Sequence, residues 1–472
     1  MCLHGQSNGN GNGRSYSNSK QLRILICSEN VQPQLNGVAR RVSEYEQGLL
    51  KAGHQVDLLH PYCEGKTWCL PHPWNSNANL MTIRPLYFLQ HMLTKHSDYD
   101  IIHAVMPLNF SGGWILAVAE LMRAMDNFIF SNSNRVDKKY PALVISYHLN
   151  TKDYIDIYSP PGVRDFQKFL MFSCLSRVLP LISDRILAPT RATEPSLLRL
   201  WPQDRIGICH TGVSYDFCPA AIDGPHGKRW LARKADFLKK TGRTYLLIVV
   251  GRLAPEKGID HLISAMPFLH DCALWIVGDG PFRQQAETIV QSRQLPVDFL
   301  GYQRNEALHS LYGAADCFVC PSQTETYGQV VQEAFACGVR VALPCVPQFV
   351  EAYQPFLPEN AWWIPDDVES MVTAIDSQVK LPPMTPKEKD HVRSQFMAWS
   401  DACNAMLVEY YEALEVSRSA RRTTLNPITI IVVIVWILVT VVVNSVGHTV
   451  YLLLAFASKL LRRHRKFYLK EE

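Results

Sequence analysis

The sequence of 472 residues predicts an α/β protein with two Rossmann-like doubly wound domains facing a cleft, plus a carboxyl-terminal membrane segment. Short β-rich runs alternate with helix-length segments, which is the pattern of a parallel sheet covered by helices. This alternation starts twice along the chain, so two such domains are expected. A long uncharged stretch near the end predicts the membrane segment, because a transmembrane helix needs about 20 apolar residues.

The first domain is predicted over residues 22–215, after a flexible Asn/Gly/Ser-rich tail at 1–21. The tail has no apolar run, so we expect neither a signal peptide nor an anchor there, although its lack of acidic residues leaves a transit peptide open. The domain opens with a buried strand at Arg23–Ser28 and a helix over Val38–Ala52 that Gly53 ends. Further strands are expected at Gln55–His60, Asp100–Ala104, Ala142–Tyr147 and Arg185–Ala188.

A linker is predicted over residues 216–244, and a second domain over 245–416 that begins with a strand at Tyr245–Val250 and ends in a crossover helix. Its further strands are expected at Ala273–Val277, Val297–Leu300, Cys317–Val319 and Val339–Leu343. Its helices are expected at Ile259–Leu269, Phe282–Arg293, Glu306–Tyr312 and Tyr327–Cys337. Two such domains place one long cleft between the carboxyl ends of their strands, where ligands of parallel sheets bind.

Residues Thr423–Ser458 contain no Asp, Glu, Lys or Arg. We expect a transmembrane or re-entrant segment over 428–457, between a basic juxtamembrane stretch at 417–427 and a basic tail at 458–472. The formal charge of +4 divides into −3 before Arg418 and +7 from there onward, so the basic charge is suited to lipid headgroups. An overall charge this small gives no reason to expect nucleic-acid binding.

The 13 cysteines are odd in number and scattered along the chain. Without a predicted signal peptide, we expect them to be reduced thiols. Cys317 and Cys320 have CxxC spacing, but they lie in an apolar, strand-like run with no second pair of ligands. A structural role is therefore expected for this pair rather than zinc binding or redox chemistry, and no metal site is predicted.

Two loops after predicted strands carry residues suited to an anionic ligand. Gly37 lies before the first helix, where the lack of a side chain lets an anion approach the backbone amides. Arg252 and Lys257 follow the strand that opens the second domain, in the segment VVGRLAPEKGID. That end of the strand faces the predicted cleft, so both cations would converge where a leaving diphosphate could be stabilised. A plain turn at Gly37 and solvated charges at Arg252 and Lys257 are the alternative interpretations.

The segment CPSQTETYGQVVQEAFACG adds two carboxylates to this candidate site. Glu325 lies in the loop after a predicted strand and could accept hydrogen bonds from sugar hydroxyls. Glu333 lies two turns along the helix that Tyr327 or Gly328 opens, and it could hold a ribose diol. The amino end of that helix could receive phosphate. Because two glutamates at this spacing often occur by chance, the prediction depends on their place after the strand.

Taken in order, these motifs resemble those of the retaining glycosyltransferases of family 4, which have the GT-B fold. The resemblance covers about residues 22–415 and is specific as an ordered set. The matching motifs are Gly37, SYHLN at Ser146–Asn150, GRLAPEKG at Gly251–Gly258, GDGP at Gly278–Pro281, FLGY at Phe299–Tyr302, and the Glu325/Glu333 pair. Within the family, the segments SYHLNTKDYIDIY, CHTGVSYDFCP and WSDACNAMLVEYYEAL are most similar to the sulfoquinovosyl transferases that make sulfolipid.

The resemblance implies roles for the matching residues. Catalytic roles fall to His148, which would face the reacting sugar, and to Glu325, which would hold the donor sugar. The donor diphosphate would be bound by Gly37, Arg252, Lys257, Thr326, Tyr327 and Gly328. The nucleotide ribose and base would be bound by Glu333, Gly278 and Tyr302. The resemblance implies no cofactor and no metal, only a nucleotide-sugar substrate, expected to be UDP-linked, so the protein acts through positioning and electrostatics.

The chain departs from the family pattern at two places. Many relatives have His-x-His where this chain has His148 and Asn150, so one candidate contact to donor or acceptor is missing. The segment VALPCVPQFVEAY is shorter than usual and lacks a Gly-Gly pair, in a loop that would lie against the donor sugar. A sulfonate on that sugar would need a nearby cation, for which Arg40, Arg41 and Lys152 are candidates.

The resemblance and the membrane segment together predict transfer of a sugar from UDP-sulfoquinovose to diacylglycerol. One alternative is a transferase that uses GDP-mannose or UDP-glucose with another lipid or glycan. A second alternative is a non-catalytic membrane scaffold built on the GT-B fold, which the altered Asn150 and the short loop would suit. A dinucleotide-dependent dehydrogenase is not expected, because no G-x-G-x-x-G follows the first strand.

We expect a membrane location, with the catalytic body facing the cytosol or the plastid stroma. Basic residues flank the apolar segment on both sides, and Asn444–His448 form a polar break in its middle. Both features favour a re-entrant or tilted hairpin with its two ends on one face of the bilayer, while a single span stays the alternative. The expected partners are therefore the nucleotide sugar, a lipid acceptor and the membrane itself.

Overall fold

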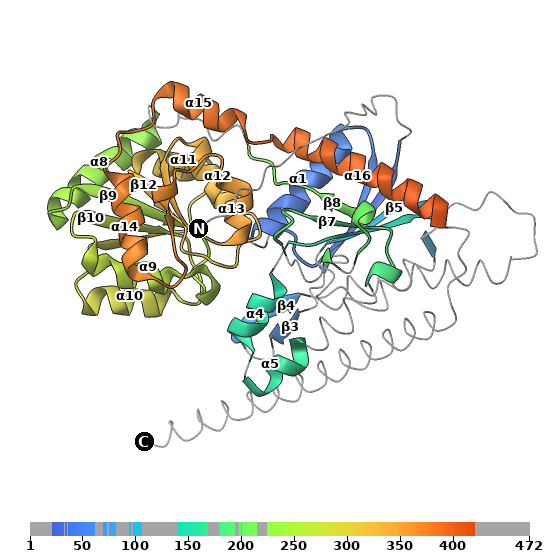
Figure 1. Ribbon diagram of the computed structural model, residues 1–472, viewed down its shortest axis with the longest axis horizontal. Helices are drawn as coiled ribbons and strands as arrows, with labels where there is room; N and C mark the ends of the chain where they lie inside the picture. The colour runs from blue at the N-terminus through green and yellow to red at the C-terminus, as the bar shows by residue number, and fades with distance from the viewer. Residues whose placement is uncertain are drawn as a thin grey trace, which may run out of the picture.

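The structure is a computed structural model that describes residues 21–32, 34, 36–61, 69–72, 75–81, 94–95, 98–105, 140–148, 150–159, 161–168, 179–193, 198–199, 201–214 and 224–420. The predicted membrane segment at 428–457 and the basic tail at 458–472 lie outside these residues. Within the described ranges, no helix is both long and apolar enough to cross a membrane. The described part forms two α/β domains that lie next to each other (Figure 1).

The amino-terminal domain is built on a six-stranded parallel sheet in the order β2-β1-β5-β6-β7-β8. The strands are β1 (Arg23–Ser28), β2 (Gln55–Leu59), β5 (Ile101–Val105), β6 (Ala142–Ser146), β7 (Arg185–Ala188) and β8 (Ile206–Ile208). Ile24 of β1 pairs with Val56 of β2 on one side and with Ile101 of β5 on the other. The strands β5 and β6 are buried along their whole length, as expected for a parallel sheet covered on both faces.

The prediction of a parallel sheet in the first domain is confirmed, but it missed some elements. The short strand β8 extends the sheet at one edge. A separate antiparallel pair, β3 (Cys69–His72) and β4 (Asn75–Met81), lies outside the sheet. The helices of this domain include α1 (Gly37–Lys51), α4 (Thr151–Tyr158) and α5 (Pro161–Lys168), with short 3-10 turns η4 (Leu179–Leu181) and η5 (Gln203–Arg205).

The helix α1 begins after Asn36, whose side chain accepts a hydrogen bond that no backbone carbonyl of the helix can accept. The Asn36 side chain accepts a hydrogen bond from the backbone N–H of Ala39, 2.8 Å away, and so caps α1. Apolar residues of α1 at helical spacing, Val42, Tyr45 and Leu49, are buried against the sheet. The helix therefore holds its amino end, with Gly37, at the carboxyl edge of β1.

The carboxyl-terminal domain has a second six-stranded parallel sheet, in the order β11-β10-β9-β12-β13-β14. In chain order this is 3-2-1-4-5-6, the order of dinucleotide-binding folds. The strands are β9 (Tyr245–Val250), β10 (Cys272–Val277), β11 (Val297–Gly301), β12 (Cys317–Val319), β13 (Arg340–Pro344) and β14 (Trp362–Trp363). The helices of this domain are α8 (Pro225–Thr241), η7 (Pro255–Lys257), α9 (Ile259–Ala265), η8 (Met266–Phe268), α10 (Arg283–Ser292), α11 (Asn305–Ala314), α12 (Gln329–Ala336), α13 (Pro347–Tyr353), η9 (Glu359–Ala361), α14 (Val368–Val379) and α15 (Pro386–Ser394). The helix α16 (Trp399–Ala420) follows them in the chain.

Most of the predicted linker at 216–244 is the helix α8, which packs on this domain. Its Trp230 is buried, and the Trp230 ring lies edge-on to the ring of Trp275, with 5.7 Å between centroids. Gly242 ends the helix in a left-handed conformation, with φ 65°. The basic residues that suggest a linker in the sequence lie mainly on the exposed side of this helix.

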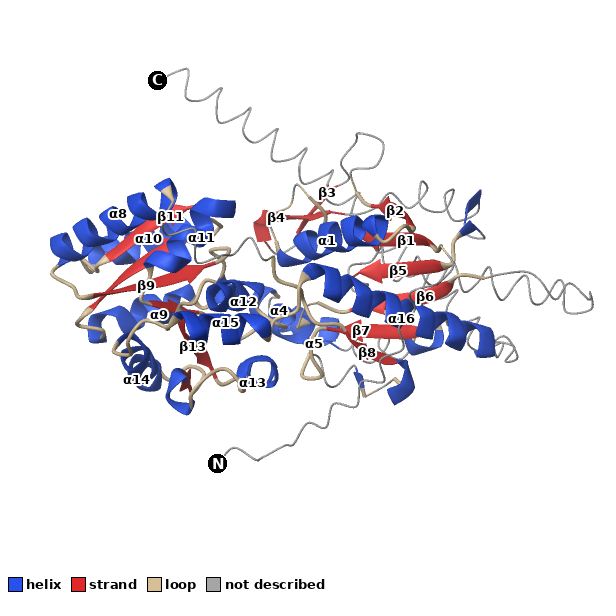
Figure 2. Ribbon diagram, turned by 90° about the horizontal axis from the view of Figure 1, so that it is seen from above, coloured by secondary structure: helices blue, strands red, loops and turns tan. Residues whose placement is uncertain are grey.

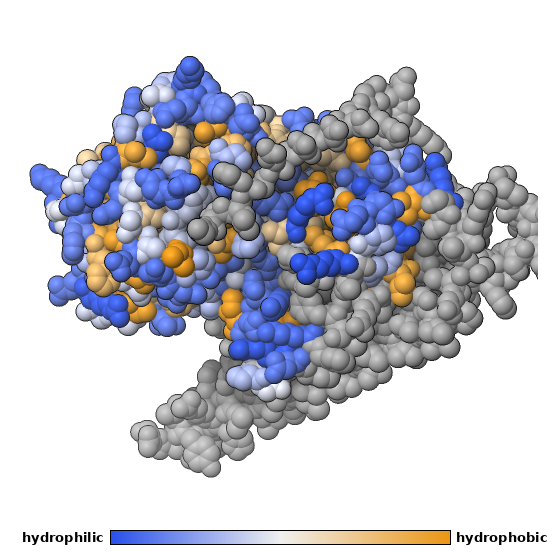
Figure 3. Space-filling model, in the orientation of Figure 1, coloured by the Kyte–Doolittle hydropathy of each residue, from blue (hydrophilic) through white to orange (hydrophobic). Residues whose placement is uncertain are grey.

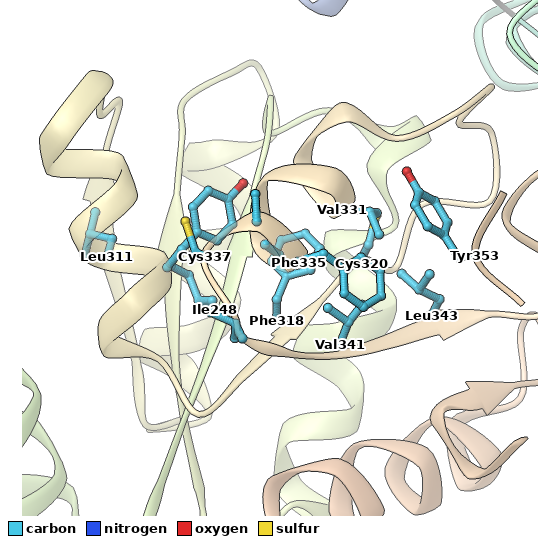
Figure 4. Packing of buried hydrophobic residues seen from close by; sticks show 14 of the residues in the cluster. Ile248, Leu311, Phe318, Cys320, Val331, Phe335, Cys337, Val341, Leu343 and Tyr353 are labelled. Atoms are coloured by element: carbon cyan, nitrogen blue, oxygen red, sulfur yellow. The ribbon is translucent and has the colours of Figure 1, made fainter. Parts of the chain in front are cut away.

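A continuous apolar core holds α12 over the second sheet (Figure 4). Phe335 of α12 lies above Phe318 and Val341, which come from β12 and β13 (Figure 4). The Phe335 ring also packs against Tyr353 and Phe396, each with 5.7 Å between ring centroids. This packing fixes the position of α12, and with it the loop that precedes the helix.

The last described helix, α16, returns from the second domain and packs on the first (Figures 1 and 2). It lies along α1 and β6 and buries Ala402, Met406 and Tyr410 there. The chain that leads into α16 passes close to Gly212, where an added Cβ would lie 2.6 Å from the Trp399 Cα. The predicted crossover helix thus belongs to the core of the amino-terminal domain. Hydrophobic residues are interspersed among hydrophilic ones on the described surface in Figure 3, as is usual for protein surfaces.

Candidate active site

The predicted site residues follow the strands that flank the switch point of the second sheet. Strand order reverses between β9 and β12, so the loops after these two strands diverge and leave room for a ligand. Arg252 and Lys257 follow β9, and Glu325 follows β12. In the first sheet the corresponding point lies between β1 and β5, and Gly37 follows β1.

Lys257 and Glu325 form an ion pair. The Lys257 Nζ lies 2.5 Å from Oε1 of Glu325, and both side chains are about one-fifth exposed, at 22% and 20%. Burial acts to lower the pKa of the Lys257 ammonium, but the Glu325 carboxylate and the nearby Tyr154 and Glu256 outweigh burial, so that pKa is raised. Lys257 therefore stays charged. From the sequence, Lys257 is predicted to bind the diphosphate and Glu325 the donor sugar. The structure brings the two side chains into direct contact.

Arg252 is held by Glu256, which sequence analysis missed. Glu256 is fully buried, and its carboxylate accepts hydrogen bonds from the Arg252 guanidinium and from the Tyr158 hydroxyl. The signal in the sequence was the i,i+4 spacing of Arg252 and Glu256. Each cation of the predicted diphosphate site thus has a carboxylate partner, so the two cations and two carboxylates balance in charge.

The tyrosines of α4 bring the first domain into this cluster. Tyr154 and Tyr158 are one turn apart on α4, with 5.8 Å between their ring centroids, and α4 contacts η7 of the second domain. Burial raises the pKa of Tyr154, and the charges of Lys257, Glu256, Glu325 and Arg252 act on it as well. The motif SYHLNTKDYIDIY contains both tyrosines, but no role was predicted for them from the sequence, because Arg252, Glu256 and Lys257 lie about 100 residues further along the chain.

Glu333 contacts the first domain through Arg40. The Arg40 guanidinium bonds to Oε1 of the nearly buried Glu333, and the Tyr312 hydroxyl donates to Oε2 over 3.1 Å. Burial raises the pKa of Glu333, while Arg40 and Tyr312 oppose this shift. A ribose diol bound by Glu333, as the sequence predicts, would share or displace these partners.

The loop before α12 contacts the first domain through Thr326 and packs against α13 of its own domain through Tyr327 and Gly328. The Thr326 hydroxyl donates a hydrogen bond of 3.3 Å to the backbone carbonyl of His148. The Tyr353 hydroxyl donates to the carbonyl of Tyr327 over 2.7 Å. Gly328 precedes α12 with φ 75°, and a Cβ there would lie 2.8 Å from the Phe349 ring, so a glycine is required. This is why α12 begins at Gln329 rather than at Tyr327.

The remaining predicted residues, Gly37, Gly278 and Tyr302, have other neighbours than the Lys257–Glu325 pair. Gly37 faces α12, since an added Cβ would lie 3.1 Å from Oε1 of Gln329. Gly278 donates its backbone N–H to the carbonyl of Gly301 over 2.8 Å, which places it next to Tyr302. Tyr302 is 48% exposed, and the Arg304 guanidinium lies over its ring, with Cζ 4.8 Å from the ring centroid.

His148 lies against Arg41 of α1. Nη1 of Arg41 is 2.8 Å from Nδ1 of the His148 ring. Burial lowers the pKa of His148 well below its ordinary value, and Arg41 and His103 lower it further. The ring is therefore neutral at physiological pH.

The three cations considered for a sulfonate differ in their surroundings. Arg40 is paired with Glu333, Arg41 is buried against His148, and Lys152 is exposed. Asn150, where many relatives have a second histidine, is buried, and its Nδ2 has no hydrogen-bond partner among the described residues. The structure thus separates the three cations but places no sulfonate.

Cys317 and Cys320 are buried in and just after β12 and pack in two different cores, one on each side of the sheet. Burial raises the pKa of the Cys320 thiol to about 12, so this cysteine is unreactive. Across the described ranges, no group of His, Cys, Asp and Glu residues is arranged to hold a metal ion.

Comparison with known families gives two matches, one for each domain. A family described as "Glycosyltransferase Family 4" matches residues 35–217, and one described as "Glycosyl transferases group 1" matches residues 232–394. Together the two matches include the predicted site residues.

Two relatives that match this chain differ in the share of their own length that the alignment covers. A sulfoquinovosyl transferase of Arabidopsis thaliana is 28% identical over 290 residues, which is 58% of this chain and 49% of the relative. The chain thus spans about half the length of that protein. A GDP-mannose-dependent alpha-mannosyltransferase of Mycolicibacterium smegmatis is 34% identical over 345 residues, covering 68% of this chain and 80% of the relative.

Among solved structures, the sucrose-phosphate synthase of Thermosynechococcus elongatus is similar, with a TM-score of 0.58 and 19% sequence identity. The similarity covers 83% of this chain and 99% of that one. At this identity the similarity concerns the fold alone, and it is the GT-B fold of two facing Rossmann-like domains.

Proposed function

This chain belongs to glycosyltransferase family 4, and we propose that it transfers a sugar from a nucleotide-sugar donor to a membrane lipid. The most specific form of the proposal is transfer from UDP-sulfoquinovose to diacylglycerol with retention of the anomeric configuration. The family provides the nucleotide-sugar chemistry, and the donor sugar, the acceptor and the location are our proposals.

The contact between Lys257 and Glu325 at the β9/β12 switch point is the observation that carries the proposal. As the bond between sugar and diphosphate breaks, negative charge develops on the diphosphate, and fixed cations stabilise it. A bound diphosphate would take over Lys257 and Arg252, which would release the Glu325 carboxylate to accept bonds from sugar hydroxyls. The domain contacts through Tyr158 and Thr326 would hold the donor in place and exclude water.

The choice of sulfoquinovose as the donor sugar is supported by the sequence motifs and by the similarity to the sulfoquinovosyl transferase of Arabidopsis. A second candidate is mannose from GDP-mannose, which the more extensive match to the mycobacterial mannosyltransferase favours. The residues proposed to bind diphosphate and ribose could bind these groups in either donor. Discrimination between UDP-sulfoquinovose and GDP-mannose would therefore depend mainly on contacts to the sugar itself.

A lipid acceptor is supported by the predicted membrane segment at 428–457, which directly follows the basic stretch at 417–427. A segment in the bilayer would hold the site near lipid hydroxyl groups. For the same reason we propose a membrane location, with the catalytic body on the side where nucleotide sugars are present, the cytosol or the plastid stroma.

The test uses membranes that contain the full-length protein, incubated with a panel of labelled nucleotide sugars. The expected result is one donor that gives a chloroform-soluble product, with UDP-sulfoquinovose as the first choice. The variants Glu325→Gln and Arg252→Ala should lower the rate by about a hundredfold or more, because each removes one charged group that acts on the reacting donor.

The matched control is Glu415→Gln, on the exposed side of α16, which should keep wild-type activity. Circular dichroism and a thermal melt check that the variants are folded. Near-normal transfer in both site variants would overturn the assignment of the site. Binding of nucleotide without turnover of any donor would instead support a non-catalytic scaffold.

A further inference from the structure

Arg41 is a buried arginine without a carboxylate partner in the part of the chain that the structure describes. Its exposed fraction is 4%, whereas the neighbouring Arg40 is paired with Glu333. Burial of a charge without an opposite charge costs free energy, so such a position usually has a specific role. Its guanidinium Nη1 is hydrogen-bonded to Nδ1 of His148, at 2.8 Å.

The chemistry of this hydrogen bond allows only one arrangement of protons. An arginine side chain can only donate, because all five of its polar hydrogens point outward and it has no acceptor. Nδ1 of His148 must therefore be the acceptor and carry no proton. A neutral imidazole has one ring proton, which then resides on Nε2.

The charged and titratable groups around His148 favour the same state. Arg41 approaches from α1, and His103 approaches from β5. His103 is itself buried and neutral, since burial lowers its pKa to about 3. Protonation of His148 at Nδ1 would bring two N–H donors together and add a positive charge next to Arg41.

We propose that Arg41 is a positioning residue that fixes His148 as the neutral tautomer with its proton on Nε2. The location of His148 next to the donor sugar rests on the proposed function, but the tautomer does not. In this form the ring enters the site as a hydrogen-bond donor, suited to a sugar hydroxyl or to a phosphate oxygen. It cannot take the proton of the acceptor hydroxyl, so that proton must leave by another route, such as the departing diphosphate.

The direct test is nitrogen NMR of the full-length protein in detergent, labelled with ¹⁵N-histidine, with His148→Asn to assign the signals. In the wild type, Nδ1 of His148 should show the shift of an unprotonated nitrogen and Nε2 that of a protonated one, without titration between about pH 5 and 8. In Arg41→Met the ring should titrate at a higher pH and show both tautomers. Arg41→Lys, which keeps a charged donor, should retain the wild-type pattern at least in part.

A kinetic measurement separates positioning from a purely structural role. Arg41→Met should lower kcat by roughly ten- to a hundredfold, the usual cost of losing a group that orients a functional histidine, with little change in KM for the donor. Arg233→Met, which removes an exposed arginine of α8, is the matched control and should not change either constant. If Arg41→Met does not fold, the titration in the wild type and in Arg41→Lys still decides the question.

Two results would overturn the proposal: a His148 that titrates near its ordinary pKa in the wild type, or a wild-type Nδ1 that carries the proton. A change in KM alone would also contradict it. If no nucleotide sugar is turned over, the proposed function fails, whereas the NMR measurement still decides the tautomer.

Discussion

The buried histidine His103 shows how a single residue links two distant parts of the chain. It lies on β5, and its Nδ1 is 2.8 Å from the hydroxyl of Tyr410 on α16. Both side chains are fully buried, and the rings meet edge-on with 5.7 Å between centroids. Burial lowers the pKa of His103 from an ordinary 6.5 to about 3. The crossover helix therefore packs on a histidine that must stay neutral.

This histidine should make the stability of the protein depend on pH. The pKa of His103 is lower in the folded than in the unfolded state. The neutral ring therefore contributes fully to the free energy of unfolding above about pH 6.5. This contribution is lost as the pH falls toward about 3, because the unfolded state then binds a proton that the folded state does not. Between pH 7 and pH 5 this predicts a loss of about 2 kcal/mol in the free energy of unfolding. In His103→Gln, which can still bond to Tyr410 but does not titrate, this part of the loss should be absent.

Urea unfolding of the wild type and of His103→Gln at the two pH values measures the difference. Other titrating groups are common to both proteins, so they cancel in the comparison. An equal loss of stability in the two proteins would show that His103 is not the group that titrates.

At the level of elements, the loops after β9 and β10 approach each other more closely than side chains would permit. Gly278 follows β10 with φ 137°, and an added Cβ would lie 1.9 Å from the carbonyl oxygen of Gly251, which follows β9. Gly278 also donates its N–H to the carbonyl of Gly301, the last residue of β11. The glycines of VVGRLAPEKG and GDGP thus serve to bring three strand ends together, next to the residues predicted to bind the nucleotide.

The variant Gly278→Ala should destabilise the carboxyl-terminal domain. The new methyl group has to push two backbone segments apart, and overpacking of this kind costs about 1–3 kcal/mol. Chemical unfolding followed by tryptophan fluorescence would measure the loss, because Trp275 and Trp363 are buried in this domain.

The matched control for this prediction is Gly162→Ala, at the start of α5. An added Cβ there has no heavy atom within 4 Å, so stability should be unchanged or slightly higher. Equal stability of the two variants would mean that the strand ends can move apart without cost.

At the scale of the whole molecule, hydrogen bonds of α12 and α13 hold the two domains together. Glu351 of α13 accepts hydrogen bonds from the backbone N–H groups of Arg191 and Ala192, both at 2.8 Å. The Gln332 side chain of α12 donates to the carbonyl of Thr211 over 3.1 Å. The polar side of α12 thus faces the other domain rather than solvent, which explains why nearly all of this helix is buried.

Removal of the Glu351 carboxylate should favour an open arrangement of the domains. Two backbone donors lose a charged acceptor in Glu351→Ala, and such hydrogen bonds contribute about 2 kcal/mol. Hydrogen–deuterium exchange should become faster at Arg191 and Ala192 and along α12, and KM for the donor should rise.

Glu415→Ala, which removes an exposed carboxylate of α16, is the control and should leave both measurements unchanged. If exchange at Arg191 and Ala192 keeps its wild-type rate in Glu351→Ala, the domains are held by the other contacts alone.

The two parallel sheets and the candidate residues at their edges could be predicted from the sequence alone. Strand and helix patterns are local, and buried parallel strands appear as apolar runs, so β9 and β12 were predicted correctly. Because the carboxyl ends of parallel strands meet at one edge, Lys257 and Glu325 could be assigned to a common region. The helix α8 was hidden by its charged exposed side, and β3, β4 and β14 have no clear periodic pattern.

The partners of these residues could not be predicted in this way, because they follow from the packing of distant segments. Tyr158 meets Glu256, Arg41 meets His148, and Arg40 meets Glu333, in pairs that are far apart in the chain. These contacts depend on how helices pack on the sheets and on how two domains close on each other. The packing of the helices and the closure of the two domains depend on many buried contacts together. Residue spacing along the sequence does not show which of these contacts form.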